Sequence, residues 1–129
     1  MLAPKILVID DDPSIGNLIE FTLSAKGYDV RVAQDPRIGM GMALSDPPHL
    51  ILLDYLLPGR DGLEFLRDIR TFADLQDTQV IMITGKGSRE TVMEARQYRV
   101  VDFIAKPFEI NLLVERVVQR VPLPGEPND

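Results

Sequence analysis

The sequence contains no cysteine and no tryptophan, only one histidine, and no long apolar run. Without cysteine the chain forms no disulfide, has no thiolate nucleophile and builds no cysteine-ligated zinc site. No apolar stretch approaches the roughly 20 residues that span a bilayer, and the N-terminus lacks the pattern of a secretion signal. We therefore expect a cytoplasmic protein with no membrane partner, whose chemistry depends on oxygen and nitrogen groups.

Basic side chains are also scarce relative to acidic ones. The chain has 14 Lys and Arg against 20 Asp and Glu, which gives a net charge of −6 at pH 7. An anionic surface repels phosphate backbones, so we expect no nucleic-acid binding within this chain. The 129 residues, 45% of them apolar, are enough for one domain with one continuous core.

Five short, mostly apolar segments of 4 to 6 residues alternate with segments of helical periodicity. Such alternation predicts parallel strands joined by crossover helices on both faces of a sheet. We expect a doubly wound, flavodoxin-like α/β domain, (βα)5, with strand order 2-1-3-4-5 over residues 1–121. Residues 122–129 are rich in proline and are predicted to be a flexible tail or the start of a linker. The expected strands are Lys5–Asp10, Val30–Ala33, Leu50–Asp54, Gln79–Thr84 and Val100–Ala105, and the expected helices are Pro13–Lys26, Asp35–Leu44, Leu63–Phe72, Arg89–Tyr98 and Phe108–Arg120.

Polar side chains stand at or just after the ends of four of these strands. Asp10 ends the first and Asp11 follows it, Asp54 ends the third, Thr84 ends the fourth and Lys106 follows the fifth. The carboxyl ends of parallel strands meet at one rim, where open α/β sheets bind ligands. Carboxylates with no histidine or cysteine beside them are ligands suited to Mg²⁺.

The set has the functional groups that phosphoryl transfer needs. The Asp54 carboxylate can attack phosphorus to give an aspartyl phosphate. Mg²⁺ and the Lys106 ammonium can neutralise the phosphoryl oxygens, and the Thr84 hydroxyl can donate to a third oxygen. The residues thus predict a metal-assisted phosphoryl site.

Four segments, in this order along the chain, resemble the receiver domain of two-component response regulators, and the resemblance extends from about Pro4 to Arg120. Any one of them alone is a weak signal, but all four on the expected elements are specific. The segments are Ile6–Asp12, Leu52–Gly62, Ile83–Gly85 and Asp102–Phe108.

The resemblance implies a role for each residue of the rim. Asp54 would be the phosphoacceptor, and Lys106 would pair with Asp54 and then with the phosphate. Asp11 would bind Mg²⁺ directly, Asp10 largely through water, and the backbone carbonyl of Leu56 would complete a ligand set that includes Asp54. The Lys106–Pro107 bond is expected to be cis, since an X–Pro bond adopts that form at low cost.

The resemblance also implies a phosphorelay signalling switch, not an enzyme with a separate substrate. The phosphodonor would be a histidine kinase or a phosphotransfer protein. Thr84 and Phe103 would act as the switch pair, changing a surface made by the fourth helix, fifth strand and fifth helix. That surface would bind an output partner or an attached output domain, or pair two copies as a dimer.

The same residues argue against two other functions, a phosphohydrolase and a flavin-binding protein. A Mg²⁺-dependent phosphohydrolase generally needs a second acid two residues after the nucleophile, where this chain has Leu56. A flavin phosphate would be repelled by the acidic loop Asp10–Asp12. A receiver fold that takes no phosphate and serves only for docking stays open as the alternative.

Two positions, Gly85 and Arg99, depart from the family pattern, and two variable positions flank the site. Gly85 stands where alanine is more common and predicts wider access to Asp54, while Leu56 and Lys86 occupy variable positions beside the site. Because Leu56 cannot orient an attacking water, we expect slow autodephosphorylation. Arg99 replaces the usual glycine at the end of the fourth helix. A left-handed conformation there costs about 1 kcal/mol or more, so either the helix ends differently or this end is strained.

The fourth helix has the thinnest apolar face of the five, so we predict that it is the least protected element. The only histidine, His49, begins a strand after Pro48 and is expected at the surface.

Overall fold

The computed structural model describes residues 2–85 and 89–125. Five parallel strands form one sheet in the order β2-β1-β3-β6-β7, which confirms the predicted order because β6 and β7 are the fourth and fifth strands of that sheet. The strands are β1 (Lys5–Ile9), β2 (Asp29–Ala33), β3 (Leu50–Asp54), β6 (Gln79–Thr84) and β7 (Val100–Ala105).

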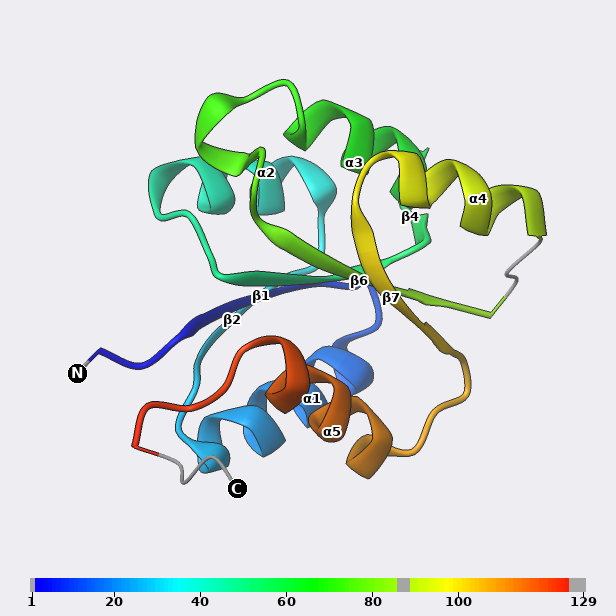
Figure 1. The fold of residues 1–129 in the computed structure, drawn as a ribbon. Helices are drawn as coiled ribbons and strands as arrows, with labels where there is room; N and C mark the ends of the chain where they lie inside the picture. The colour runs from blue at the N-terminus through cyan, green and yellow to red at the C-terminus, as the bar shows by residue number, and fades with distance from the viewer. Residues whose placement is uncertain (1, 86–88, 126–129) are drawn as a thin grey trace.

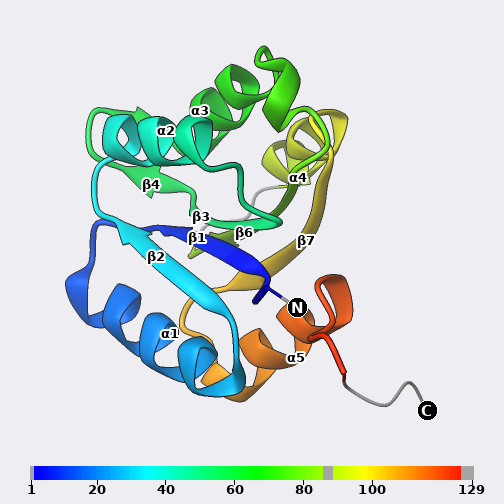
Figure 2. The ribbon, with the colours of Figure 1, turned by 90° about the vertical axis from the view of Figure 1, so that its left-hand side faces the viewer.

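Two layers of helices cover the sheet (Figures 1 and 2). One layer contains α2, α3 and α4, and the other contains α1 and α5. No helix in the described parts of the chain is both apolar and long enough to span a membrane. The helices are α1 (Pro13–Lys26), α2 (Pro36–Ser45), α3 (Gly62–Ile69), α4 (Arg89–Gln97) and α5 (Ile110–Arg120).

The apolar core is divided by the sheet. Because side chains alternate along a strand, Leu7 and Ile9 of β1 join the cluster under α2, α3 and α4, whereas Ile6 and Val8 join the cluster under α1 and α5. The central strand β3 is buried at every residue, as expected for a parallel strand covered on both faces.

Local signals in the sequence account for the ends of α1 and α2. The Asp12 carboxylate accepts a hydrogen bond from the Ser14 backbone N–H at 2.9 Å, and Asp35 accepts one from Arg37 at 2.7 Å. Gly27 ends α1 in a left-handed conformation with φ of 114°. The predicted bounds of α1, β3, β6 and β7 are therefore confirmed.

The buried face of α1 differs from the predicted one. The helical spacing of the sequence predicts one face made of Ile15, Leu18, Ile19 and Thr22. In the structure Leu18 is 47% exposed, and the buried residues are Gly16, Ile19 and Leu23. A Cβ at Gly16 would lie 2.8 Å from Val32 Cγ1. The absence of a side chain at Gly16 lets the helix approach β2 closely, and this approach rotates Leu18 toward solvent.

The segments after β3 and β7 also differ from the expected ones. A short antiparallel pair, β4 (Leu56–Leu57) and β5 (Arg60–Asp61), precedes α3 and was not predicted. Helix α3 is shorter than expected and is followed by a 3₁₀ turn, η1 (Ala73–Leu75), while α5 begins at Ile110. The Lys106–Pro107 bond is cis, as the family resemblance implied. Arg99 has a φ of 66°, so of the two alternatives the strained, left-handed end of the fourth helix is the one observed.

The chain after α5 returns to the first helix. The Tyr28 hydroxyl donates to the Val121 carbonyl at 2.5 Å, and Leu123 packs against the core cluster beneath α1 and α5. Residues up to Leu123 therefore contact the domain, and the predicted tail beyond Gly125 lies outside the described residues.

Candidate functional site

The predicted polar residues meet at the carboxyl end of the sheet. Two of them continue the hydrogen bonding of the strands by one residue: Asp10 N–H donates to the Ala33 carbonyl at 3.1 Å, and Lys106 N–H donates to the Thr84 carbonyl at 2.9 Å. Asp54 is the last residue of β3 and pairs with Ile83 of β6. The strand ladder therefore brings carboxylate, hydroxyl and ammonium groups to one rim.

One ammonium is shared by two buried carboxylates. Lys106 Nζ lies 3.2 Å from Asp10 Oδ2 and 3.1 Å from Asp54 Oδ2. Asp10 is 1% exposed and Asp54 5% exposed. Their other oxygens accept backbone hydrogen bonds, Asp10 Oδ1 from Asp12 at 2.9 Å and Asp54 Oδ1 from Leu56 at 3.3 Å. The resemblance implied a pair between Lys106 and Asp54, and the structure adds Asp10 to it.

This arrangement changes the proton affinity of the groups. Burial, followed by the charge of Asp10, raises the pKa of Asp54, and the hydrogen bond from Lys106 offsets only part of that rise. Burial lowers the pKa of Lys106, but the hydrogen bond and charge of Asp54, with those of Asp10, outweigh it and raise the pKa. Lys106 therefore stays charged, and the cluster retains uncompensated negative charge.

The cluster has the donor set of a Mg²⁺ site. Asp10, Asp11 and Asp54 can each offer one oxygen such that these atoms lie within 4.8 Å of one another. Asp11 is exposed, so this group of carboxylates opens to solvent on one side. Oxygen-only ligands that combine with water suit Mg²⁺, and a divalent cation would neutralise the charge that Lys106 leaves. The residues present thus fit the metal that the fold family implies.

The two residues of the predicted switch lie on adjacent strands. Thr84, which is 6% exposed, pairs with Ala105, and Phe103 pairs with Met82. Since alternate residues of a strand share a face, Thr84 and Phe103 lie on the same face of the sheet. Phe103 is half-buried against the core cluster under α2, α3 and α4, and the Arg96 guanidinium carbon lies 6.0 Å from the centre of its ring.

The turn that follows Asp54 depends on a glycine whose role was not predicted. Gly62 N–H donates to the Tyr55 carbonyl at 2.6 Å, and a Cβ at Gly62 would lie 3.0 Å from the Asp54 carbonyl oxygen. A larger residue would push the β4–β5 turn away from the end of β3. The turn-forming run Pro58–Gly62 was recognisable in the sequence, but the close approach to Asp54 was not.

Of the departing and variable positions, Leu56 and Gly85 lie at the rim, whereas Arg99 follows the end of α4. The Leu56 side chain is 57% exposed beside Asp54. A Cβ at Gly85 would lie 3.8 Å from Lys106 Cβ, which is an ordinary contact. Lys86 lies outside the described residues, as do Gly87 and Ser88.

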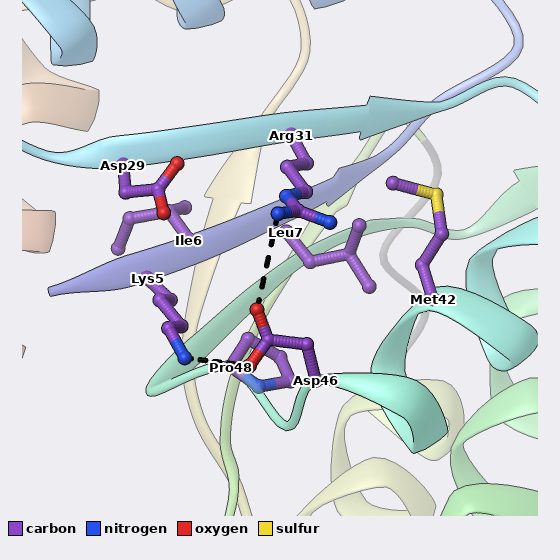
Figure 3. A pocket seen from close by; sticks show the side chains of 8 residues that line it. All are labelled: Lys5, Ile6, Leu7, Asp29, Arg31, Met42, Asp46 and Pro48. Carbon is purple, nitrogen blue, oxygen red and sulfur yellow. Dashed lines mark hydrogen bonds and ion pairs between the residues drawn. The ribbon is translucent and has the colours of Figure 1, made fainter.

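A second charged cluster occupies the opposite end of the sheet (Figure 3). Lys5 Nζ lies 2.5 Å from Asp46 Oδ1, and Arg31 Nη2 lies 3.9 Å from Asp46 Oδ2. These groups line a cavity of about 20 Å³, which is room for about one water molecule. His49 is exposed there as expected, and its Nδ1 accepts from the Lys5 backbone N–H at 2.9 Å. Asp29 also lines the cavity, so two cations and two carboxylates balance there. The small volume and this balance make the cluster a structural contact, not a ligand site.

Comparisons with known proteins agree with this geometry. The family model of the response regulator receiver domain matches residues 6–118. The chemotaxis protein CheY4 of Vibrio cholerae is 27% identical, with a TM-score of 0.87, and the match covers 92% of this chain and 99% of that one. The receiver domain of the Francisella response regulator 1452 is 31% identical, with a TM-score of 0.80 and coverage of 88% and 93%. The BeF₃-activated receiver domain of DrrB is 26% identical, with a TM-score of 0.78 and coverage of 92% and 97%.

Proposed function

The chain belongs to the response regulator receiver domain family, and from this premise we propose that it is a signalling switch phosphorylated on Asp54. The observation that carries the proposal is the buried pair of carboxylates, Asp10 and Asp54, which share the single ammonium of Lys106. A merely structural salt bridge would balance its charges. This site instead keeps a carboxylate oxygen beside an ammonium and retains negative charge that a metal would neutralise.

The transfer would be an in-line displacement at phosphorus. An Asp54 carboxylate oxygen forms the new O–P bond while the N–P bond to a donor phosphohistidine breaks, and the departing imidazole nitrogen takes a proton. The Lys106 ammonium would pair with the Asp54 oxygen before the transfer and with a phosphoryl oxygen after it. The Thr84 hydroxyl would donate a hydrogen bond to another phosphoryl oxygen.

Asp10, Asp11, Asp54 and the Leu56 carbonyl would hold Mg²⁺. When bound, the metal supplies positive charge that favours the approach of an anionic phosphoryl group. The chain's own residues bind and orient the donor, and the reaction ends on the chain itself. We therefore propose that it is not an enzyme with a separate substrate.

The phosphodonor would be a histidine kinase or a phosphotransfer protein, both of which act on cytoplasmic receivers. Phosphorylation adds charge and acceptor oxygens beside Thr84. Because Thr84 and Phe103 share a face of β6 and β7, movement of one changes the space open to the other. The surface of α4, β7 and α5 would transmit that change to an output partner, an attached output domain or a second copy.

The test is phosphorylation by a small donor. Incubation with acetyl phosphate or phosphoramidate and Mg²⁺ is expected to add one phosphoryl group, detected by intact-mass analysis. The adduct should disappear in Asp54→Asn and persist in Asp46→Asn, which makes the same chemical change at the opposite end of the sheet. An absence of any adduct would favour the docking alternative, and turnover of external phosphate esters would favour a hydrolase.

The lifetime of the adduct tests the role of Leu56. Its exposed side chain offers no hydrogen bond to a water attacking the phosphoryl group. Replacing Leu56 with Asn should shorten the phosphoryl lifetime, measured by the decay of the adduct mass after the donor is removed. An unchanged lifetime would contradict this role for Leu56.

A further inference from the structure

Helix α4 buries few of its described side chains. Among its described side chains only Ala95, near the C-terminal end, is fully buried, and Met93 is 59% exposed. The body of the helix therefore contributes little burial to its own stability. In Figure 1 the helix runs from the carboxyl side of β6 back toward the start of β7.

One arginine from outside α4 donates hydrogen bonds to the C-terminal end of that helix. Arg70, the residue that follows α3, donates from Nε to the Tyr98 carbonyl at 2.9 Å and from Nη2 to the Arg99 carbonyl at 3.3 Å. Both carbonyls lie just beyond the last helical residue, Gln97. The guanidinium thus serves as a cap contributed from outside the helix.

The same guanidinium also holds the connection between α3 and β6. Arg70 Nη1 donates to the carbonyls of Leu75 at 2.8 Å, Gln76 at 3.3 Å and Thr78 at 2.7 Å. All three guanidinium nitrogens are in use, and hydrogen bonds from a charged donor are stronger than neutral ones. Burial, followed by the charge of Arg99, lowers the pKa of Arg70 to about 10, so the group stays protonated at neutral pH.

The backbone at this end is held in a conformation that few residues adopt. Arg99 has a φ of 66°, and its N–H donates to the Arg96 carbonyl at 3.0 Å, beside the bond from Tyr98 N–H to Ala95 at 3.0 Å. A left-handed arginine persists where surrounding contacts fix it. The bonds from Arg70 to both carbonyls of this turn provide that constraint.

We propose that Arg70 makes the C-terminal end of α4 the fixed end of a hinge, about which the N-terminal end moves when the switch changes state. This inference rests on the proposed function for its trigger, but the anchor exists in the free protein and can be tested there. Arg70 acts as a positioning residue: it touches no part of the phosphorylation site and determines which end of α4 responds.

The first test is amide hydrogen exchange by NMR on the unphosphorylated full chain. The reporters are Tyr98 and Arg99 at the anchored end, and Met93 and Glu94 one turn into the helix. Arg70→Gln should speed exchange at Tyr98 and Arg99 by about tenfold or more while Met93 and Glu94 stay within about twofold. Arg67→Gln, which removes an exposed arginine from the same helical turn, is the control and should change neither pair.

Arg70→Lys provides a second variant if the glutamine variant does not fold. It keeps the charge but replaces the planar five-donor fork with a compact ammonium, so it should give the same selective loss in a smaller amount. Thermal unfolding of each variant checks that it is folded. If exchange is accelerated equally at both pairs of amides, or at neither pair, Arg70 does not anchor the end of α4.

The second test adds beryllofluoride and Mg²⁺ to the full chain as a phosphoryl analogue. In the wild type the amide shifts should change more at Met93 and Glu94 than at Tyr98 and Arg99, and Arg70→Gln should extend the change to the second pair. Equal changes at both pairs in the wild type would overturn the hinge. Failure of the analogue to bind and of Asp54 to take phosphate would overturn the trigger as well, whereas the exchange pattern of the free protein would still decide the anchor.

Discussion

The two ends of the central sheet use the same kinds of charged residue in opposite ways. At the amino end, Asp46 lies between Lys5 and Arg31, and the side chains of Lys5 and Asp46 are each 35% exposed. At the carboxyl end, Asp10 and Asp54 are almost fully buried and share Lys106. An exposed carboxylate with two cations is satisfied by its neighbours and by water. Two buried carboxylates with one cation are not satisfied in this way. This lack of positive charge distinguishes a reactive site from a structural contact.

The largest expected difference between the ends is the effect of removing a lysine. Lys106→Gln leaves two adjacent buried carboxylates without a cation and should lower the free energy of unfolding by about 2 kcal/mol in metal-free buffer. Lys5→Gln should cost less than about 0.5 kcal/mol, because Asp46 keeps Arg31 and water. Urea unfolding measures both, and equal losses would remove the distinction between the two ends.

The next largest effect is stabilisation by Mg²⁺. At about ten times its dissociation constant, a metal that binds only the folded state should add about 1.4 kcal/mol to the free energy of unfolding. The gain should be lost in an Asp10→Asn/Asp11→Asn double variant and kept in Asp46→Asn. Thermal unfolding with and without Mg²⁺ is the measurement, and a gain that survives in the double variant would place the metal elsewhere.

Replacing an aspartate with asparagine should change stability in opposite directions at the two ends of the sheet in metal-free buffer. The pKa of Asp54 is raised by burial and by Asp10, so the folded state disfavours its charge, and the stability it contributes in the protonated form is lost as pH rises. Asp54→Asn should therefore stabilise the protein at neutral pH, measured by urea unfolding. Asp46→Asn should lower the unfolding temperature, and a change of the same sign at both ends would contradict the contrast.

The smallest expected effect is the pH dependence of the amino-end contact. The hydrogen bond from Lys5 lowers the pKa of Asp46 below its ordinary value of 3.8. A lowered pKa contributes stability above the unfolded-state pKa, and this stability is lost as pH falls through the folded-state pKa. The small difference in unfolding temperature between wild type and Asp46→Asn should thus be present at neutral pH and disappear below pH 3.8. A difference that persists at lower pH would arise from packing.

The parts of the fold that the sequence predicts are those with local causes. A run of four apolar residues, Leu50–Leu53, is enough to identify β3. Asp12, Pro13 and Gly27 bound α1 because caps act on adjacent backbone groups. The rotation of α1 was not predictable in this way. It depends on the contact of Gly16 with Val32 of a neighbouring strand, which a helical periodicity does not contain.

The same distinction holds for the candidate site: the positions of its residues were predictable from the sequence, but the contacts of their side chains were not. Strand ends identify Asp10, Asp54, Thr84 and Lys106, because the topology alone brings the ends of parallel strands together. That Lys106 lies equally near both buried carboxylates depends on the path of one flexible side chain and could not be read from spacing. The hydrogen bonds of Arg70 could not be predicted for a related reason. The partners of Arg70 are backbone carbonyls, which have no signature in a sequence.

The bond from Tyr28 to Val121 joins residues 93 positions apart and has a consequence for synthesis of the chain. The cluster beneath α1 and α5 draws on β1 at one end of the sequence and on α5 and Leu123 at the other, so it stays open until nearly the whole chain has left the ribosome. The buried residues of the cluster on the other face lie between 7 and 100, with Phe103 packed against them, so that cluster can close earlier. We expect the nascent domain to complete the face that carries α2, α3 and α4 first, and to expose α1 until its last helix arrives.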